Sequence, residues 1–402
     1  MYHMPMGNRM ADPEPILVEN QEQVDELCAA CRGQGRFAFD TEFVMEDRYE
    51  TEVCLIQVAT AGQVWLVDPY LKLEIGPLWQ LVCEAESETI VHAGQEDLAL
   101  CARATGSPPR NVFDVQIAAG LVGYEYPMSL QKLVQAILHI RLHKAKTLTD
   151  WRKRPLSGSQ LRYAAEDVSY LLAVRDKLHS KLTQRRRVEW AKEEFLRFEE
   201  ATLYQRVEQE KLFRMKGSGM LKGRELAILG QLLPWRERIA QQRNRPARTV
   251  IKDHVLIEIA KLGLTSFSEI RDLRGLNLSD RDVHALAKAA HEAAEIPADQ
   301  WPKTLPREME SAGETILIAL LTAVLRSYSL KQELAYGLLA TKKGMTELIR
   351  YLRGGRKLDR QEVELLRGWR GKAVGKMLND VLSGKSSLRV ADNNGEAIIE
   401  TV

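Results

Sequence analysis

Cysteine is scarce in this sequence of 402 residues, and long uninterrupted apolar runs are missing from it. The five cysteines are odd in number and scattered, which argues against a disulfide framework. Cys28 and Cys31 form a C-x-x-C, but no second ligand pair accompanies them, and their segment reads as the end of an amphipathic helix. No apolar run approaches the roughly 18 residues that cross a bilayer, and the N-terminus lacks the apolar core of a secretory signal. We therefore expect a cytoplasmic protein without a membrane partner.

Charge is distributed unevenly, although the formal net charge is only +2. Residues 1–180 carry 17 Lys and Arg against 25 Asp and Glu, whereas residues 181–402 carry 40 against 30. The basic second part suggests a polyanion partner, although a charged run is more often a solvated face.

The first half of the chain alternates between strand-like and helix-like segments. Three strand-like runs, FAFDTEF, VCLIQVAT and QVWLVD, follow a short strand and a helix, and the turn AGQ can join the last two runs as a hairpin. Helices and strands then alternate, and 156–187 reads as one long helix with Ser157 or Ser159 as its N-cap. This order predicts an α/β domain over residues 1–190.

The second half reads as helical. A charged helical linker, 191–215, leads to consecutive short helices in 216–296 and, after a Pro-rich break, to a second helical block in 314–384. The tail, 385–402, has little to bury, so we expect it to be loosely ordered.

Two acids stand in the otherwise apolar run FAFDTEF. Because alternate residues of a strand share a face, Asp40 and Glu42 project together, and Thr41 projects oppositely. A divalent cation stabilises carboxylates that are crowded in this way, and hard oxygen ligands suit Mg²⁺ or Mn²⁺. A strand edge with solvated acids would explain the pair equally well.

Three further residues add weight to the metal interpretation. Asp97 follows the strand TIVHA at the start of a helix, and Tyr163 and Asp167 share a helix face through their i, i+4 spacing. If they converge with the strand pair, the acids could hold two metal ions, and the tyrosine hydroxyl could orient a water. Spacing alone leaves that convergence open.

The segments DTEF, HAGQEDL and YAAEDVSYL resemble the three exonuclease motifs of the DEDD superfamily, in its tyrosine-bearing (DEDDy) branch. CLIQVAT, WLVDP, FDVQIAAGL and TDWRKRPLSGSQLRYAAEDVSYL also resemble the ribonuclease D family, so the resemblance covers 17–180. It implies a ribonuclease H-like α/β fold, with a mixed central sheet flanked by helices, and metal-dependent 3′→5′ hydrolysis of RNA. It also implies that two divalent ions, Mg²⁺ or Mn²⁺, bind Asp40, Glu42, Asp97 and Asp167. Tyr163 would position the attacking water.

Several other residues are candidates for contact with RNA. His92 could touch the terminal nucleotide or be a satisfied histidine at a strand end, and the same choice applies to Gln95. Lys144, Trp151 and Arg154 belong to a basic, loop-like run that suits phosphates and base stacking. For Trp151, a role as an anchor of the loop to the core is favoured.

The segment GRELAILGQLLPWRERIAQQRN and the text after it, roughly 216–296, resemble the helicase-and-ribonuclease-D C-terminal (HRDC) domain, an accessory helical bundle that binds nucleic acid. The block 314–384 is similar to a second, diverged copy. Phosphates would be attracted, without regard to base sequence, by Arg236, Arg238, Arg243, Arg245, Arg248 and Lys252. Trp235 is more consistent with a core residue than with a stacking platform.

These features together predict a metal-dependent 3′→5′ exoribonuclease that releases nucleoside 5′-monophosphates and trims structured RNA, with tRNA precursors as the expected substrates. A 3′→5′ DNA exonuclease is an alternative with the same chemistry, because no residue can be assigned to a 2′-OH contact. A non-catalytic RNA-binding protein is an alternative from another class, and it predicts that Asp40→Ala would leave function intact.

Overall fold

The structure is a computed structural model that describes residues 14–143, 149–204, 212–213, 215–302, 310–354, 359–393 and 396–402. The chain forms two compact units, each of which is discontinuous in sequence. The first unit comprises Met1–Glu42, Cys54–Tyr204 and Glu310–Val402, and the second comprises Phe43–Val53 and Gln205–Met309.

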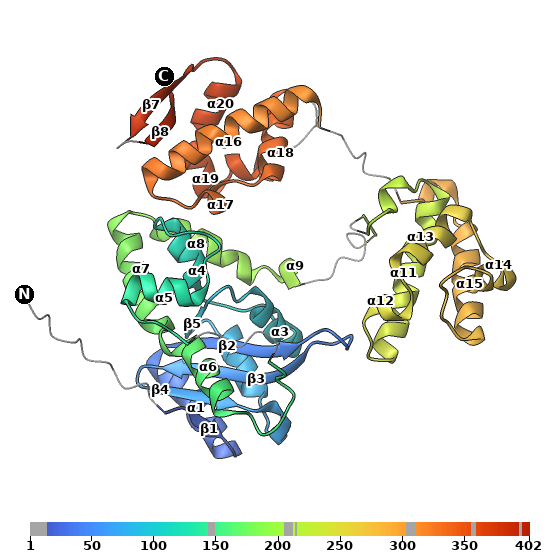
Figure 1. Ribbon diagram of the computed structural model, residues 1–402, viewed down its shortest axis with the longest axis horizontal. Helices are drawn as coiled ribbons and strands as arrows, with labels where there is room; N and C mark the ends of the chain where they lie inside the picture. The colour runs from blue at the N-terminus through green and yellow to red at the C-terminus, as the bar shows by residue number, and fades with distance from the viewer. Residues whose placement is uncertain are drawn as a thin grey trace, which may run out of the picture. The chain divides into compact units, whose positions relative to one another are not determined.

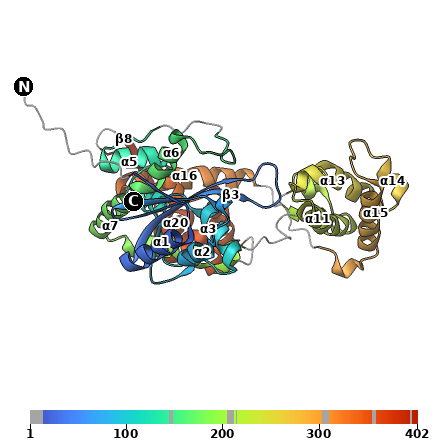
Figure 2. The same ribbon diagram turned by 90° about the horizontal axis from the view of Figure 1, so that it is seen from below.

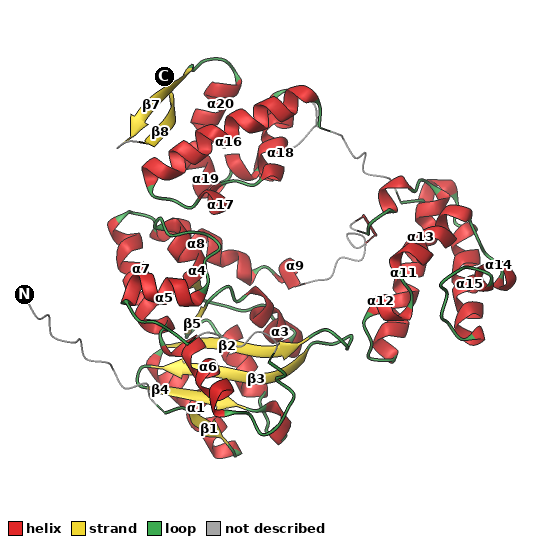
Figure 3. Ribbon diagram, in the orientation of Figure 1, coloured by secondary structure: helices red, strands yellow, loops and turns green. Residues whose placement is uncertain are grey.

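A mixed six-stranded sheet lies at the centre of the first unit (Figures 1 and 3), in the order β1-β4-β3-β2-β5-β6. The pairs β1–β4, β2–β5 and β5–β6 are parallel, and β3–β4 is antiparallel. The turn Ala61–Gly62 joins β3 to β4, with φ 97° at Gly62, which confirms the expected hairpin. The strands are β1 Ile16–Val18, β2 Arg36–Val44, β3 Glu52–Thr60, β4 Gln63–Val67, β5 Glu88–Val91 and β6 Val112–Asp114.

Helices flank this sheet on two sides, as the α/β class requires. Figure 2 shows α1, α2 and α3 below the strands and α5 and α6 above them. The helices of this part are α1 Gln21–Gln34, α2 Gly76–Cys83, α3 Gln95–Thr105, α4 Val115–Leu121, α5 Leu130–Leu138, α6 Gly158–Ser169, α7 Leu171–Gln184, α8 Val188–Leu196 and α9 Ala201–Tyr204.

Local sequence signals account for the ends of two of these helices. Helix α1 begins after Asn20, whose side chain accepts a hydrogen bond from the Gln23 N–H, and it ends at Gly35 with φ 67°. Its Cys28 and Cys31 are buried, and burial raises the pKa of the two thiols to about 11 and about 12. The C-x-x-C therefore belongs to the hydrophobic core.

The prediction of one helix over 156–187 is wrong, because the chain forms two helices there, α6 and α7. Ser157 is the N-cap of α6, and it forms a capping box with Gln160. The break falls at Tyr170, directly after Ser169, whose hydroxyl donates to the Ala165 carbonyl at 2.6 Å. Such a bond back to the preceding turn competes with regular helical geometry and bends helices.

The second unit contains helices around a core of its own. Trp235, 2% exposed, and Leu232 belong to this core, as expected for the tryptophan. The expectation that the neighbouring Arg236 attracts phosphates is wrong, because its side chain is buried and donates to Asp253 Oδ1 at 2.6 Å. The helices are α11 Arg224–Gln242, α12 Ala247–Val250, α13 Asp253–Leu262, α14 Phe267–Arg271 and α15 Asp280–Ala294.

The C-terminal helical block belongs to the same compact unit as the sheet. Gly120 of α4 meets it directly, since its carbonyl accepts from the Ala335 N–H at 2.8 Å. Arg370 of this block is buried and donates to Glu194 of α8 at 2.5 Å. The block contains α16 Ala312–Gln332, α17 Tyr336–Leu339, α18 Lys342–Leu352, α19 Gly368–Arg370, α20 Lys376–Leu382, β7 Leu388–Asn393 and β8 Glu396–Thr401.

Two features of this block differ from expectation. The tail is not loosely ordered, because β7 and β8 form an antiparallel hairpin, and the Ile399 N–H donates to Ser327 Oγ of α16 at 2.8 Å. Among the described helices, α16 alone is long and apolar enough to cross a membrane by length and composition. Its Leu321 and Leu325 are fully buried, and a single helix of this kind is weak evidence for a membrane span.

Candidate active site

The five signature residues come from three elements of the first unit. Asp40 and Glu42 lie on β2, Asp97 lies in the first turn of α3, and Tyr163 and Asp167 lie on α6. Asp97 is buried, and the other four are half-buried. The charges of Asp97, Asp167 and Glu42 all contribute to the raised pKa of Asp40, so the four carboxylates lie within electrostatic range of one another.

Burial and mutual repulsion make these carboxylates hard to ionise. Burial, followed by the charges of the other three acids, raises the pKa of Asp40 well above its usual range. Burial is also the largest cause of the raised pKa of Glu42, about 8, of Asp167, about 7, and of Asp97, about 6. Such a cluster needs positive charge to exist in its fully ionised form.

Two hydroxyl groups stand next to the cluster. The Tyr163 hydroxyl hydrogen-bonds the Asp167 carboxylate, and burial raises the pKa of Tyr163 above its usual value. Thr41 was expected to project away from the acids, but its hydroxyl donates to Asp97 Oδ1. Strand alternation missed this contact because it says nothing about the helix that passes beside the strand.

The donor set fits divalent metal ions, since four carboxylates supply only hard oxygen ligands. Within the described part of the chain, no three acidic, histidine or cysteine side chains stand close enough to hold an ion as they are. Two of the four carboxylates, Asp97 and Asp167, instead accept hydrogen bonds from Thr41 and Tyr163. Ligation would therefore require the carboxylates to move closer together around a shared ion.

The raised pKa values predict that the metal-free protein becomes less stable as the pH rises from about 5 to about 8. In this window the folded acids keep protons that the unfolded chain has lost, so the free energy of unfolding falls with pH. We expect a loss on the order of 3 kcal/mol, allowing for coupling among the groups. Thermal unfolding in EDTA across this range measures it.

A control and an opposing group accompany this prediction. Saturating Mg²⁺ should flatten the profile, because bound cations favour the ionised carboxylates. Burial lowers the pKa of His92, which works in the opposite direction below about pH 6.5, but it is one group against the four acids of the cluster. A metal-free protein whose stability stays level or rises between pH 5 and 8 would contradict the expected repulsion.

His92 and Gln95 lie at the turn that precedes Asp97. His92 Nε2 stands 2.9 Å from the Met128 carbonyl oxygen, to which it can donate, so this ring nitrogen already has a protein partner. Gln95 is exposed at the start of α3, so it stays a candidate for contact with RNA. The structure therefore favours the satisfied-histidine interpretation for His92.

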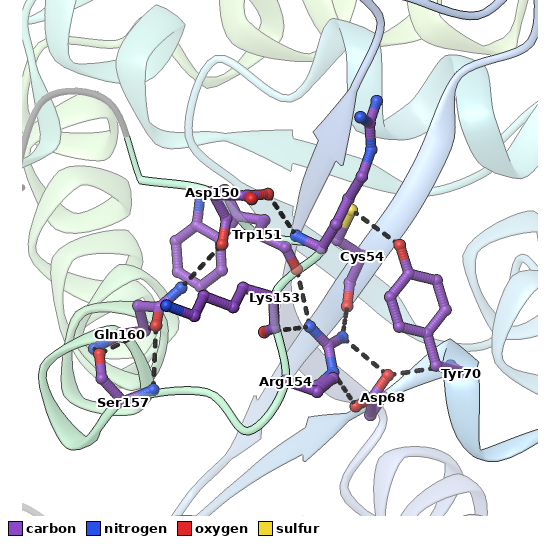
Figure 4. Close-up of polar contacts among 10 residues, drawn as sticks. Cys54, Asp68, Tyr70, Asp150, Trp151, Lys153, Arg154, Ser157 and Gln160 are labelled. Carbon is purple, nitrogen blue, oxygen red and sulfur yellow. Dashed lines mark hydrogen bonds and ion pairs between the residues drawn. The ribbon is translucent and has the colours of Figure 1, made fainter.

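The basic run around Arg154 suggested a phosphate contact, but its side chain instead contacts other residues of the first unit (Figure 4). Its guanidinium forms a two-point ion pair with Asp68 at 2.5 and 2.8 Å. It also donates to the Cys54 and Trp151 carbonyls, both at 2.7 Å, and lies 4.5 Å from the centroid of the Tyr70 ring. These contacts occupy the donors that a phosphate would need, so Arg154 fastens the loop to β3 and β4.

Trp151 and Lys144 are the other two candidates in that run. Trp151 is 9% exposed, and its ring lies 6.2 Å from that of Tyr163, in agreement with the anchoring role. Lys144 lies outside the described residues.

The three candidate RNA-binding arginines Arg243, Arg245 and Arg248 of the second unit are all exposed. Arg243 pairs with Asp282 at 2.7 Å, and Arg248 pairs with Asp253 at 3.3 Å. Arg245 lies between them in sequence. The Arg248 side chain is 81% exposed, so its pair is weak and can exchange Asp253 for a phosphate. Arg243 is held more firmly, because both oxygens of the buried Asp282 accept from it.

Comparison with known proteins agrees with this arrangement. A family model described as 3′-5′ exonuclease matches residues 15–183, and the HRDC domain model matches residues 225–283. Ribonuclease D of Pseudomonas paraeruginosa is 32% identical over 376 residues, covering 92% of this chain and 98% of that protein. Ribonuclease D of Bartonella henselae is 30% identical, covering 92% of this chain and 90% of that protein.

Solved structures extend the similarity to three dimensions. Escherichia coli RNase D, described as an exoribonuclease involved in structured RNA processing, aligns with a TM-score of 0.80 at 26% identity, over 92% of this chain and 99% of that one. A protein from Bifidobacterium adolescentis aligns with a TM-score of 0.68 at 20% identity, over 92% and 97% of the two chains, which shows the shared fold.

Proposed function

Because this chain belongs to the ribonuclease D family and is a 3′→5′ exoribonuclease, we propose that it trims the 3′ ends of structured RNAs, chiefly tRNA precursors. Its products would be nucleoside 5′-monophosphates, and it would act in the cytoplasm. The similarity to the E. coli enzyme of structured RNA processing supports the substrate class. The proposed chemistry rests on one observation. Four carboxylates from β2, α3 and α6 interact electrostatically, and Tyr163 hydrogen-bonds one of them, Asp167.

In this proposal Asp40, Glu42, Asp97 and Asp167 hold two divalent cations, Mg²⁺ or Mn²⁺. When bound, these ions would supply the charge that stabilises the attacking and leaving oxygens of the phosphodiester. Tyr163 keeps its proton because its pKa is raised, and it hydrogen-bonds Asp167. Its oxygen lone pair can then accept a hydrogen bond from a water and hold that water for attack. No covalent intermediate with the protein is needed.

One assay tests substrate and metal together. The protein is incubated with 3′-extended tRNA and with single-stranded DNA of equal length, in Mg²⁺, Mn²⁺ or EDTA. We expect mononucleotide release from the RNA with either metal and no release in EDTA. Preferred hydrolysis of DNA would overturn the RNA assignment, and activity that survives EDTA would overturn the metal mechanism.

The second unit is expected to bind RNA through its exposed cations. Replacing Arg245 and Arg248 with alanine should weaken binding of full-length tRNA precursor and reduce the slope of log affinity against log salt by about 2. Cleavage of short oligomers should stay unchanged. Fluorescence anisotropy at several salt concentrations measures the slope.

Arg32→Ala provides the matched control for this pair. Arg32 is an exposed cation of the first unit that pairs with Glu84 at 2.9 Å. Its removal should leave the salt slope as it is. Equal slopes for the wild type and the double variant would refute a role of these two arginines in phosphate binding.

A further inference from the structure

A strained turn joins β5 to α3 and thereby places Asp97, which lies in the first turn of that helix. Ala93 has φ 54° in this turn, a left-handed conformation that residues other than glycine rarely adopt. Gly94 follows, and a Cβ there would lie 2.6 Å from the Cβ of Val91. Backbone strain of this kind persists only where surrounding groups hold it in place.

Asp114, the last residue of β6, holds the turn. Its Oδ1 accepts a hydrogen bond from the Ala93 N–H at 3.2 Å, and its Oδ2 accepts one from the Gly94 N–H at 3.3 Å. Oδ1 also caps α4, because it accepts from the Gln116 N–H at 2.8 Å. The side chain is buried, and Asp114 pairs with Val91 in the β5–β6 ladder. One carboxylate therefore ties together the edge strand, the start of α4 and the turn before Asp97.

We infer that Asp114 is a positioning residue for the active site, because through the Ala93–Gly94 turn it sets where α3 begins and hence where Asp97 stands. The inference rests on the proposed role of Asp97 as a metal ligand. Helix α3 begins directly at the turn, because the Leu98 N–H donates to the Gly94 carbonyl at 2.9 Å. A shift of Gly94 therefore moves the whole first turn of the helix. Residues that orient ligands in this way govern metal affinity without touching the metal.

Asp114→Asn isolates this role. The asparagine oxygen can keep the α4 cap and the Ala93 contact, but its NH₂ group faces the Gly94 N–H, which loses its acceptor. We expect the variant to bind Mn²⁺ about tenfold more weakly, measured by EPR on the full-length protein, with an unchanged circular dichroism spectrum. Adding Ala93→Gly should recover part of this loss, because glycine adopts φ 54° without strain.

The control is Asp282→Asn, which neutralises a buried carboxylate in the first turn of α15 in the second unit and should leave Mn²⁺ affinity unchanged. If Asp114→Asn does not fold, Ala93→Val takes its place, since the exposed Ala93 allows a β-branched residue that adds strain while Asp114 stays. Weaker Mn²⁺ binding is expected there too.

The outcomes separate this inference from the proposed function. A wild-type protein that binds no Mn²⁺ would overturn the proposed metal site, and the inference with it. A wild type that binds Mn²⁺ and variants that bind it equally well would overturn the inference alone. If Ala93→Gly recovered none of the Mn²⁺ affinity lost in Asp114→Asn, Asp114 would not act through the Ala93–Gly94 turn.

Discussion

Asp40→Asn is expected to lower exoribonuclease activity by about a thousandfold and yet to make the metal-free protein more stable. Asp40 is the carboxylate on which the charges of Asp97, Asp167 and Glu42 all act, so its neutralisation removes repulsion from the folded state. The same change removes a ligand that the proposed metal site needs. Single-turnover hydrolysis of a 3′-extended RNA with Mg²⁺ and thermal unfolding in EDTA measure the two effects.

Asp176→Asn is the control for this prediction, because it neutralises an acid of the same unit with the opposite electrostatics. Asp176 pairs with Arg36 at 2.6 Å, and the ion pair holds the pKa of Asp176 below its usual value against the effect of burial. This variant should keep its activity and become slightly less stable. If Asp40→Asn also lost stability in EDTA, the carboxylates would not repel one another as inferred here.

Much of the site could be predicted because its residues obey local periodicities. Asp40 and Glu42 share a strand face, and Tyr163 and Asp167 share a helix face, so two pairs follow from spacing alone. Their convergence with Asp97 depended on the resemblance to known exonucleases, because no periodicity relates one element to another. The α/β class and the β3–β4 hairpin followed from the order of segments and from one short turn.

The features that escaped prediction all depend on contacts between distant parts of the chain. Arg154 stands in a basic run, and only the fold reveals that Asp68, 86 residues earlier, occupies its guanidinium. The tail has a weak apolar pattern and becomes ordered through its contact with Ser327, 72 residues before Ile399. Charge and composition indicate what a segment could bind, whereas the fold determines which of the possible partners the segment contacts.

Glu194→Ala is expected to destabilise the first unit by about 4 kcal/mol and to lower its melting temperature by about 10 °C. Glu194 is 3% exposed and accepts hydrogen bonds from Arg370 Nη1 at 2.5 Å and from Trp369 Nε1 at 2.6 Å. Without the carboxylate, the buried guanidinium of Arg370 would keep its charge and retain only Glu364, at 3.6 Å, as a counter-ion, which costs more than the pair itself contributes. Thermal unfolding monitored by circular dichroism measures the loss.

Glu189→Ala, on the same helix α8, supplies the matched comparison. Glu189 pairs with Lys192 at 2.9 Å, but both side chains are exposed, so its removal should cost less than about 1 kcal/mol. A large difference between the two variants would mean that the C-terminal block is held to α8 by a buried ionic contact and stabilises the catalytic unit. Equal, small losses would instead mean that the block contributes little to that stability, and that the exonuclease fold stands without it.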